Sequence, residues 1–436
     1  MLEQREEACK DRTSVELFAG GGGLAMAVHR AGFRPLLVNE FAKRACETLE
    51  ANGAKPRGDA EYVPNPGEPW PLVAGDVQKL DMTYLAGQVD VLAGGPPCQP
   101  FSLGGVAKGD EDKRNMFPEM FRAVRQIRPK AVICENVRGL LRPSFKPYFH
   151  YILRELALPF IERDDRDSWQ EHDRLLQRIK NEASTDPTER YRVEMVEVNA
   201  ADYGVPQIRN RIIIVAFRED LGVNLKTFHD AVQPQYSEAA LSKSMIDGSY
   251  WDRHPLVPSH VRERVMARVE QDLSLEIEDT TKKPWRTLRD AIAGIDGNLP
   301  LPPIRWDRLD RKEYREGGFS DHVGWPGARI YAGHTPNELD RPAKTVKAGV
   351  HGVPGGESVV LTDDLVADPD SSCGLSYRHR YMTVREAARV MTFPDDWKLQ
   401  GPRGEKMRQL GNAVPVLLGE VFAKAVAAAL DEAERR

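Results

Sequence analysis

A cysteine on a rigid turn is the residue of this chain best placed to do chemistry. The segment Gly94-Gly95-Pro96-Pro97-Cys98-Gln99-Pro100-Phe101-Ser102 follows an apolar run, Val89–Ala93, that we expect to form a short buried strand. The two prolines fix φ and remove backbone donors, so the chain leaves the strand along one defined route. Such a turn directs the sulfur of Cys98 outward at the rim of a sheet. A buried core cysteine is the alternative, because unpaired cysteines are among the most buried residues.

Groups that could act together with a thiol occur in two other segments. Glu135 ends the apolar run Ala131–Glu135, Arg211 begins the apolar run Arg211–Phe217, and Arg209 stands just before it. A carboxylate and two guanidiniums beside a thiol suit nucleophilic catalysis on a substrate that develops charge. Hydride transfer by a nicotinamide would need no such nucleophile.

A glycine-rich turn and two acidic residues indicate an adenosyl ligand. Gly20–Gly23 joins the expected strand Ser14–Phe18 to a helix, and its glycines let the backbone approach a ligand at the helix N-terminus. Glu40 ends the second strand, where an acid accepts hydrogen bonds from ribose hydroxyls. Asp76, at the end of the third strand, could accept one from an adenine amino group. Helix N-caps are the alternative roles of both acids, and NAD and S-adenosylmethionine both remain open on these residues alone.

A sheet must bring these groups together. Short apolar runs alternate with helix-like stretches in the first half of the chain, which predicts βαβ units around a mostly parallel sheet. Ligands bind at the carboxyl ends of the strands in such sheets, so we predict an α/β fold with the site at that edge. The expected strands are Ser14–Phe18, Arg34–Glu40, Val73–Asp76, Val89–Ala93, Ala131–Glu135 and Arg211–Phe217. The expected helices include Leu24–Ala31, Ala42–Asn52 and a last one from Val414 to about Glu432.

Two segments interrupt this alternation. The charge-rich stretch Glu162–Glu194 is interpreted as an insertion that contains a solvated helix, and the stretch from Gly222 to Tyr377 is irregular and rich in Pro, Gly and Trp. We therefore predict that residues 1–221 form the first part of a catalytic and cofactor-binding domain. Residues 222–377 would form a smaller, irregular domain, and residues 378–436 would return to complete the first.

The composition excludes several other classes of protein. The chain has 436 residues, 41% hydrophobic and 29% charged, as in ordinary globular proteins. Its apolar runs fall short of a membrane span and its charged N-terminus shows no secretory signal, so we expect a cytoplasmic protein without membrane contact. Five scattered cysteines without metal-type spacing predict free thiols and no metal site. With a net charge of −5, any surface for nucleic acid must be a local patch of Lys and Arg.

Taken together, the motifs resemble those of DNA cytosine-5 methyltransferases of the bacterial and phage restriction-modification type. The similarity covers most of the chain, and the motifs occur in the family's usual order. They are Phe18-Ala19-Gly20 with Gly23, Asn39-Glu40, Gly75-Asp76, Pro97-Cys98-Gln99 with Phe101-Ser102, Glu135-Asn136-Val137, Gln207 with Arg209 and Arg211, Arg341-Pro342 with Thr345, and Gln409-Leu410-Gly411-Asn412-Ala413-Val414. The resemblance implies a Rossmann-like sheet domain that uses S-adenosylmethionine, with a smaller target-recognition domain at residues 222–377.

The resemblance also implies a reaction, methyl transfer to carbon 5 of a cytosine in a specific duplex DNA sequence. Cys98 would add to carbon 6 and thereby make carbon 5 nucleophilic. Glu135 would hold or protonate ring nitrogen 3, while Arg209 and Arg211 would orient the base and keep the carboxylate placed. The cytosine must first flip out of the duplex. The glycine-rich stretch Leu103–Gly109 suits a mobile loop that closes over the DNA.

Contacts to the cofactor S-adenosylmethionine are carried over in the same way. They fall on the first three strand ends, the nucleophile turn and the last motif. The residues are Phe18, Ala19, Gly20, Gly22, Gly23, Leu24, Glu40, Asp76, Val77, Pro97, Asn412 and Val414.

Duplex DNA is the expected partner, bound by a monomer, and a cognate restriction endonuclease or defence-system proteins are further candidates. Lys282, Lys283, Arg286 and Arg289 are candidates for phosphate contacts, while the tryptophans of the irregular region are expected in a small core. A tRNA cytosine-5 methyltransferase is the nearest rival, but a compact recognition region would suit it better. Two more distant hypotheses are a catalytically idle DNA-binding relative and an NAD-dependent oxidoreductase.

Overall fold

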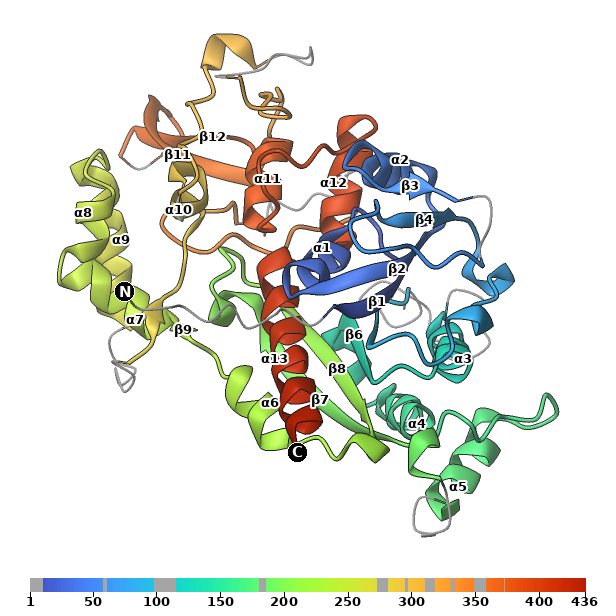
Figure 1. Cartoon of the computed structure of the whole chain (residues 1–436). Coiled ribbons are helices and arrows are strands. Elements are labelled where there is room, and N and C mark those ends of the chain that lie inside the picture. Colours follow the sequence, from blue (N-terminus) through green and yellow to red (C-terminus); the bar gives the residue numbers. More distant parts are fainter. Residues whose placement is uncertain are drawn as a thin grey trace, which may run out of the picture. The chain divides into compact units, whose positions relative to one another are not determined.

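The structure is a computed structural model that forms two compact units (Figure 1). It describes residues 11–57, 61–97, 115–179, 186–272, 281–294, 297–309, 318–330, 333, 335–348, 358–371 and 373–436. Unit 1 comprises Met1–Val198, Asn210–Gln233 and Gly419–Arg436, and unit 2 comprises Asn199–Arg209 and Pro234–Leu418. The chain therefore changes unit four times, whereas the sequence suggested changes near residues 222 and 377. The boundaries near residues 222 and 377 were predicted to separate a catalytic domain from a recognition domain. That division of function stays a prediction.

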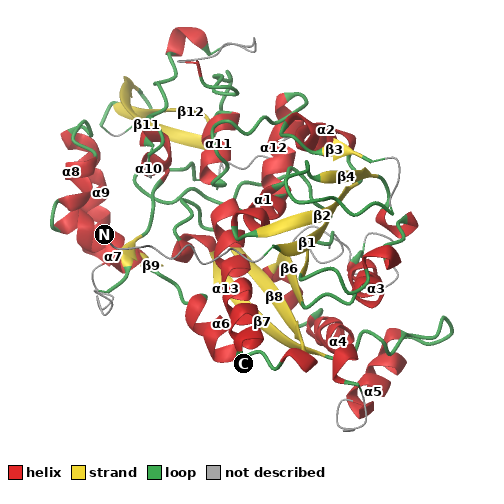
Figure 2. Cartoon of the chain, in the orientation of Figure 1, coloured by secondary structure: helices red, strands yellow, loops and turns green. Residues whose placement is uncertain are grey.

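An eight-stranded sheet organises unit 1 (Figure 2). Its strand order is β3-β4-β2-β1-β5-β6-β8-β7. Neighbouring strands from β3 to β6 are parallel, and β8 runs antiparallel to β6. The strands are β1 Arg12–Leu17, β2 Phe33–Glu40, β3 Lys55–Pro56, β4 Pro71–Ala74, β5 Val91–Gly94, β6 Ala131–Val137, β7 Tyr191–Asn199 and β8 Asn210–Arg218. The predicted α/β fold with a mostly parallel sheet is confirmed.

Helices of unit 1 follow their strands and bury an apolar stripe. In α3 the buried side chains Phe117, Met120, Phe121, Val124 and Ile127 recur at the three- and four-residue spacing of one helix face. They join a core that includes residues of β1, β5, β6 and β8. The helices are α1 Gly23–Arg30, α2 Lys43–Ala51, α3 Phe117–Ile127, α4 Lys146–Ala157, α5 Trp169–Ile179 and α6 Leu225–Ala231.

Unit 2 is less regular, as expected for most of its length. A small core gathers side chains of α7, α8 and α9, and it includes Trp251 and Trp285, as predicted. Trp306 and Trp325, predicted to lie in such a core as well, are half-buried and not part of it. The elements are β9 Tyr236–Ser237, α7 Glu238–Ile246, α8 Ser249–Arg253, α9 Ser259–Asp272, β10 Lys283–Pro284, α10 Leu288–Ala293, β11 Val359–Ala367, β12 Leu375–Tyr381, α11 Val384–Val390 and α12 Arg403–Asn412. Strands β11 and β12 pair antiparallel, and β9 and β10 form a second small sheet.

One predicted DNA contact in unit 2 is already occupied by the protein. Arg289 donates from Nε to Asp340 at 2.6 Å and from Nη1 to Asp363 at 2.7 Å, and Nη2 bonds to both aspartates. Burial lowers the pKa of Arg289, but the two carboxylates outweigh it and raise the pKa above its usual value. The prediction of a phosphate contact is therefore wrong for Arg289, because all three nitrogens of its guanidinium already bond to aspartates. Lys283 and Arg286 lie over the ring of Tyr236 and stay candidates.

The last helix is α13 Val416–Arg435. The helical stretch Arg403–Arg435 contains an 18-residue window of mean hydropathy 1.8, long and apolar enough to cross a membrane by length and composition. This corrects the expectation that all apolar runs are too short. However, 67% of that window is buried inside the protein, which is typical of the core helix of a globular fold.

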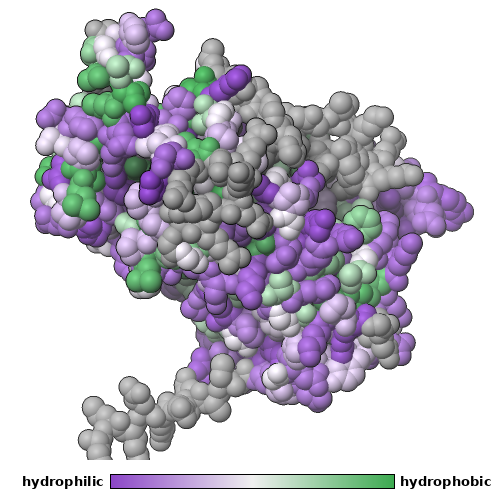
Figure 3. All heavy atoms as spheres, turned by 90° about the horizontal axis from the view of Figure 1, so that it is seen from above, coloured by the Kyte–Doolittle hydropathy of each residue, from purple (hydrophilic) through white to green (hydrophobic). Residues whose placement is uncertain are grey.

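The face drawn in Figure 3 is mostly hydrophilic, with hydrophobic side chains in small groups.

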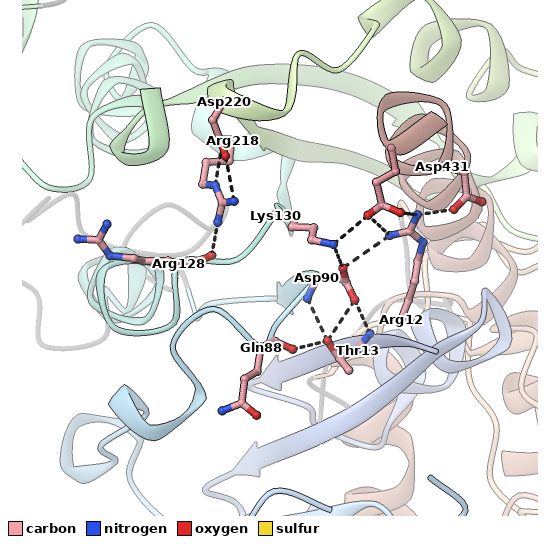
Figure 4. Close-up of polar contacts among 10 residues, drawn as sticks. Arg12, Thr13, Gln88, Asp90, Arg128, Lys130, Arg218, Asp220 and Asp431 are labelled. Carbon is pink, nitrogen blue, oxygen red and sulfur yellow. Dashed lines mark hydrogen bonds and ion pairs between the residues drawn. The ribbon is translucent and has the colours of Figure 1, made fainter. Parts of the chain in front are cut away.

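A network of charges ties the last helix to the amino-terminal end of the sheet (Figure 4). Arg12, at the start of β1, pairs with Asp431, with Glu434 at 3.3 Å and with Asp90 at 3.6 Å. Lys130 pairs with Asp90 and with Glu434, each at 2.8 Å. Burial lowers the pKa of Lys130, yet its two carboxylate partners outweigh burial and raise it. Asp90 therefore holds two cations that are partly shielded from water.

We expect Asp90→Asn to lower the free energy of unfolding by about 1–3 kcal/mol, because Arg12 and Lys130 lose a partner that is only 13% exposed. Urea denaturation would measure the loss. The matched control is Asp431→Asn, which removes a partner of Arg12 that is 42% exposed and should cost less than about 1 kcal/mol. Equal effects of the two substitutions would contradict the assignment of Asp90 as the centre of the network.

Candidate active site

The first turn of unit 1 holds its backbone in a conformation that opens space for a ligand. Phe18, Gly20 and Gly22 have φ angles of +57°, +55° and +90°. This left-handed region costs a residue with a side chain, such as Phe18, about 1–2 kcal/mol. A Cβ added at Gly20 would meet no atom within 4 Å. Gly22 begins α1 without a side-chain cap, so N–H groups of the first helical turn face this end of the sheet.

Glu40 connects the ends of β1, β2 and β4. Its Oε2 accepts from the N–H of Gly20 at 2.6 Å, and its Oε1 accepts from the N–H of Ala42 at 2.6 Å. The N–H of Gly75 donates to the backbone oxygen of Glu40 at 2.8 Å. The side chain is buried, so a carboxylate is fixed at the edge where the predicted ribose contact lies.

Asp76 follows the end of β4 and is half-buried. Its Oδ1 accepts from the N–H of Gln78 at 3.1 Å and so caps the short helix Val77–Lys79. Asp76 thus does have the helix-capping role, which uses one of its two carboxylate oxygens. Ala19, Gly23, Leu24 and Val77 are buried beneath this edge.

The turn after β5 is held by neighbours on two sides. A Cβ at Gly94 would approach the backbone oxygen of Leu17 to 2.9 Å and Met120 Sδ to 3.1 Å, so a side chain at Gly94 would force its neighbours to shift. Asn136 Nδ2 donates to the backbone oxygen of Pro96 at 3.1 Å. Pro97 is exposed. Cys98, like the predicted loop Leu103–Gly109, lies outside the described residues, and its role stays a prediction.

Two other described cysteines are unsuited to nucleophilic attack. Burial raises the pKa of Cys134 to about 12 and, together with the charge of Glu40, that of Cys46 to about 11. A thiol with such a pKa is protonated at neutral pH and is a poor nucleophile. Cys373 is exposed and belongs to unit 2.

Glu135 and Arg211 form an ion pair beside the end of β5. Arg211 Nε lies 2.8 Å from Glu135 Oε1, and the two side chains are 14% and 11% exposed. The register explains the contact: Glu135 stands opposite Ile213 and Val137 opposite Arg211, so the pair is diagonal on one face of the antiparallel strands β6 and β8. A Cβ at Gly95 would lie 3.7 Å from Glu135 Oε2. The carboxylate is therefore beside the turn that leads to Cys98.

The remaining predicted residues belong to unit 2. Arg209 is buried, and its guanidinium donates to the backbone oxygens of Val346, Gly411 and Ala413. Asn412 is exposed at the end of α12, and Val414 is buried. Unit 1 thus brings together the glycine turn, Glu40, Asp76, Glu135 and Arg211, whereas Arg209, Asn412 and Val414 are held by unit 2. Among the described residues, no group of three or more His, Cys, Asp or Glu side chains could hold a metal ion.

Two residues of unit 1 lie next to the site, although the sequence analysis assigned them no role. Asn136, named there only as part of a motif, donates to the turn after β5, and Phe41, which follows Glu40, is 76% exposed. An aromatic ring that is exposed directly after a buried strand end is a signal for a ligand-stacking surface. An asparagine at a buried strand end indicates a side chain that forms hydrogen bonds with the backbone of a neighbouring turn.

Glu16, on β1 just before the glycine turn, is a buried acid with an unsatisfied oxygen. It is 3% exposed, and its Oε2 has no hydrogen-bond partner within the described part of the chain. Burial raises its pKa well above the ordinary 4.5. Because the folded pKa exceeds the unfolded one, Glu16 favours folding below about pH 4.5 and loses this contribution as the pH rises through the folded pKa.

We therefore expect Glu16→Gln to raise the free energy of unfolding at pH 8, with a gain that shrinks as the pH approaches 5. Urea denaturation of both proteins at the two pH values measures this difference. The exposed Glu50→Gln serves as the control for the same change of charge at the surface. A gain independent of pH would show that the charge of Glu16 is not the cause.

The sheet and the polar groups at its carboxyl edge define an α/β protein with a candidate ligand site at that edge. The chain belongs to the family of C-5 cytosine-specific DNA methylases, which matches residues 12–158 and 169–428. It is thus a DNA (cytosine-5-)-methyltransferase. The unmatched residues 159–168 overlap only the start of the insertion predicted at Glu162–Glu194, and α5 lies within the matched part.

Individual relatives resemble the chain over nearly its whole length. The type II methyltransferase M.PspPI of Psychrobacter sp. (strain TA137) is 31% identical over 436 residues, covering 99% of this chain and 83% of the relative. M.Eco47II of Escherichia coli, also a type II methyltransferase, is 31% identical over 433 residues, covering 97% of this chain and 81% of the relative.

Two solved structures share the fold at low sequence identity. A DNA modification methyltransferase encoded within a prophage of E. coli has a TM-score of 0.54 at 19% identity and covers 97% of this chain and 100% of its own. The Dnmt2 methyltransferase of S. pombe has a TM-score of 0.51 at 15% identity, with coverage of 97% and 99%.

Proposed function

We propose that this methyltransferase uses S-adenosylmethionine to methylate a flipped cytosine in a specific duplex sequence through a covalent bond to Cys98. The Glu135–Arg211 ion pair beside the Gly94–Pro97 turn carries this proposal. It supplies an oriented carboxylate next to the segment that bears the nucleophile. Because both side chains are largely buried, their charges act with little screening by water.

Cys98, Glu135 and Arg211 each have a distinct role in the proposed reaction. The thiolate of Cys98 adds to carbon 6 while ring nitrogen 3 takes a proton held by Glu135, and the electrons of the ring double bond become available at carbon 5. After methylation, carbon 5 gives its proton to bound water, the carbon–sulfur bond breaks with its electron pair returning to Cys98 as a thiolate, and nitrogen 3 returns its proton to the carboxylate. Arg211 keeps Glu135 in place, and its charge favours the thiolate of Cys98.

The edge of the sheet fits an adenosyl group. Open space above Gly20, the fixed carboxylate of Glu40 and the half-buried Asp76 suit a ligand that carries hydroxyl and amino donors. The exposed ring of Phe41 would stack on its base. When bound, S-adenosylmethionine supplies the methyl group. Asn412 and Val414 would complete these contacts, as the family resemblance implies.

The names of the relatives support a proposal for the substrate and its biological setting. A duplex buries carbon 6 of cytosine in the base stack, so the base must flip out at a cost of a few kcal/mol. Because M.PspPI and M.Eco47II are named type II methyltransferases, we propose that this enzyme protects one DNA sequence from a cognate restriction endonuclease or serves a larger defence system. Action as a monomer in the cytoplasm stays a prediction.

Bisulfite sequencing of DNA from cells that express the protein tests activity, substrate and sequence context together. We expect 5-methylcytosine at one short duplex sequence. In vitro, labelled methyl transfer is compared on duplex DNA and on tRNA, and activity on tRNA alone would overturn the proposal. Binding of a fluorocytosine-containing duplex without a covalent adduct would favour a catalytically idle DNA-binding protein instead.

A further inference from the structure

In unit 2, the segment that contains Arg209 pairs with a segment more than a hundred residues further along the chain. Ile208 N donates to the backbone oxygen of Ala343 at 2.8 Å, and Ala343 N donates to that of Pro206 at 2.9 Å. Val346 N donates to Gln207 Oε1 at 3.1 Å. Residues 206–209 therefore lie in a fixed register against residues 343–346.

Arg209 extends this pairing to a third segment. Its Nη1 donates to the backbone oxygen of Val346 at 3.1 Å, and its Nη2 donates to those of Gly411 at 2.9 Å and Ala413 at 3.0 Å. The side chain is 1% exposed. The two terminal nitrogens of this guanidinium donate to three carbonyl oxygens, so the side chain links these segments to one another. It is therefore poorly placed to orient a base at the same time.

The third segment carries Asn412 between the two carbonyls that Arg209 holds. Gly411 packs so closely that a Cβ there would lie 2.3 Å from Ala348 N and 2.4 Å from Lys347 C. Asn412 itself is exposed. The backbone on both sides of Asn412 is thus fixed, while its side chain faces solvent.

We propose that Arg209 is a positioning residue for S-adenosylmethionine binding and does not touch the cytosine: it holds the Gly411–Val414 segment so that Asn412 and Val414 meet the ligand. The inference rests on the proposed function, in which these two residues contact S-adenosylmethionine. It separates the roles of the two arginines of the motif, since Arg211 pairs with the carboxylate Glu135.

The test compares Arg209→Lys with Arg211→Lys in the full-length protein. Lysine keeps the charge but cannot reproduce the planar fork. Calorimetry without DNA measures the Kd of S-adenosylmethionine, and steady-state assays measure KM and kcat on duplex DNA. We expect Arg209→Lys to raise both Kd and KM at least about tenfold, or 1.4 kcal/mol, with kcat within threefold of wild type. Arg211→Lys should lower kcat and leave Kd unchanged.

Arg385→Lys is the matched control for a general loss of stability. Arg385 is also 1% exposed and donates to the backbone oxygens of Ser320, Pro394 and Trp397, which are other segments of unit 2. Its substitution should lower Tm and leave the Kd of S-adenosylmethionine within twofold. If Arg385→Lys weakens binding as much as Arg209→Lys does, the role of Arg209 is structural only.

Other outcomes also decide the proposal. If Arg209→Lys lowers kcat and leaves Kd and KM unchanged, Arg209 acts on the cytosine and the proposal is overturned. The absence of any change in kcat, KM and Kd would also overturn the proposal. If Arg209→Lys does not fold, Thr345→Val gives a milder test, because it removes the 2.8 Å bond from Thr345 Oγ1 to the backbone oxygen of Ile208. That variant should raise Kd two- to fivefold, and an unchanged Kd would contradict the proposal. Since calorimetry needs no turnover, it decides the role of Arg209 even if the wild-type protein methylates no DNA.

Discussion

Replacement of Cys98 by serine should reduce methylation of duplex DNA to less than about one thousandth of the wild-type rate, a rise of about 4 kcal/mol in the barrier. A serine hydroxyl is not ionised at neutral pH and cannot make carbon 5 nucleophilic by addition to carbon 6. Labelled methyl transfer measures the rate. Thermal unfolding and calorimetric binding of S-adenosylmethionine should remain close to wild type, because the substitution changes one atom.

The control for Cys98→Ser is Cys373→Ser, which alters an exposed thiol of unit 2. It should retain full activity and still form a covalent adduct with fluorocytosine-containing duplex, whereas Cys98→Ser should form none. Turnover retained by Cys98→Ser would overturn the whole mechanism.

Glu135→Gln is expected to lower kcat by a factor of about 10² to 10⁴, the usual contribution of a placed acid or base. Glutamine preserves the size of the side chain but can neither supply a proton to ring nitrogen 3 nor pair with the charge of Arg211, 2.8 Å away. Binding of S-adenosylmethionine should not change. Single-turnover methylation at saturating S-adenosylmethionine isolates this effect on chemistry.

The same chemical change in an exposed ion pair provides the control for Glu135→Gln. Glu197 lies 3.3 Å from Arg138, with exposed fractions of 48% and 61%. Glu197→Gln should leave kcat unchanged and cost less than about 1 kcal/mol of stability. A rate within twofold of wild type for Glu135→Gln would show that Glu135 does not take part in the reaction.

Six of the eight strands of the large sheet could be predicted because a local apolar pattern encodes them, whereas β3 and β7 were not predicted. The run Arg34–Glu40 became β2 Phe33–Glu40, and the helix expected at Ala42–Asn52 became α2 Lys43–Ala51. Residues at strand ends were predictable as a group, since parallel strands place their carboxyl ends at one edge. The contact between Glu135 and Arg211 then follows from the pairing of β6 with β8.

The different contacts of Arg209 and Arg211 could not be predicted from local pattern. Arg211 lies within β8, where strand geometry directs its side chain, whereas Arg209 precedes that strand. The partners of Arg209 at Val346 and Gly411 come 137 and 202 residues later. Arg289 shows the same limit, because its carboxylate partners Asp340 and Asp363 are distant in sequence. Single basic residues therefore indicate a DNA contact only after their protein partners are known.

The chain crosses between the two units four times, and this affects the design of chimeric proteins. A chimera cut at residues 222 and 377 would receive a foreign Ala343–Val346 segment but keep the resident Pro206–Arg209 segment that pairs with it. A transplant that respects the compact unit must carry Asn199–Arg209 along with Pro234–Leu418. Its last junction then falls inside α13, so the donor and recipient helices must be joined in phase.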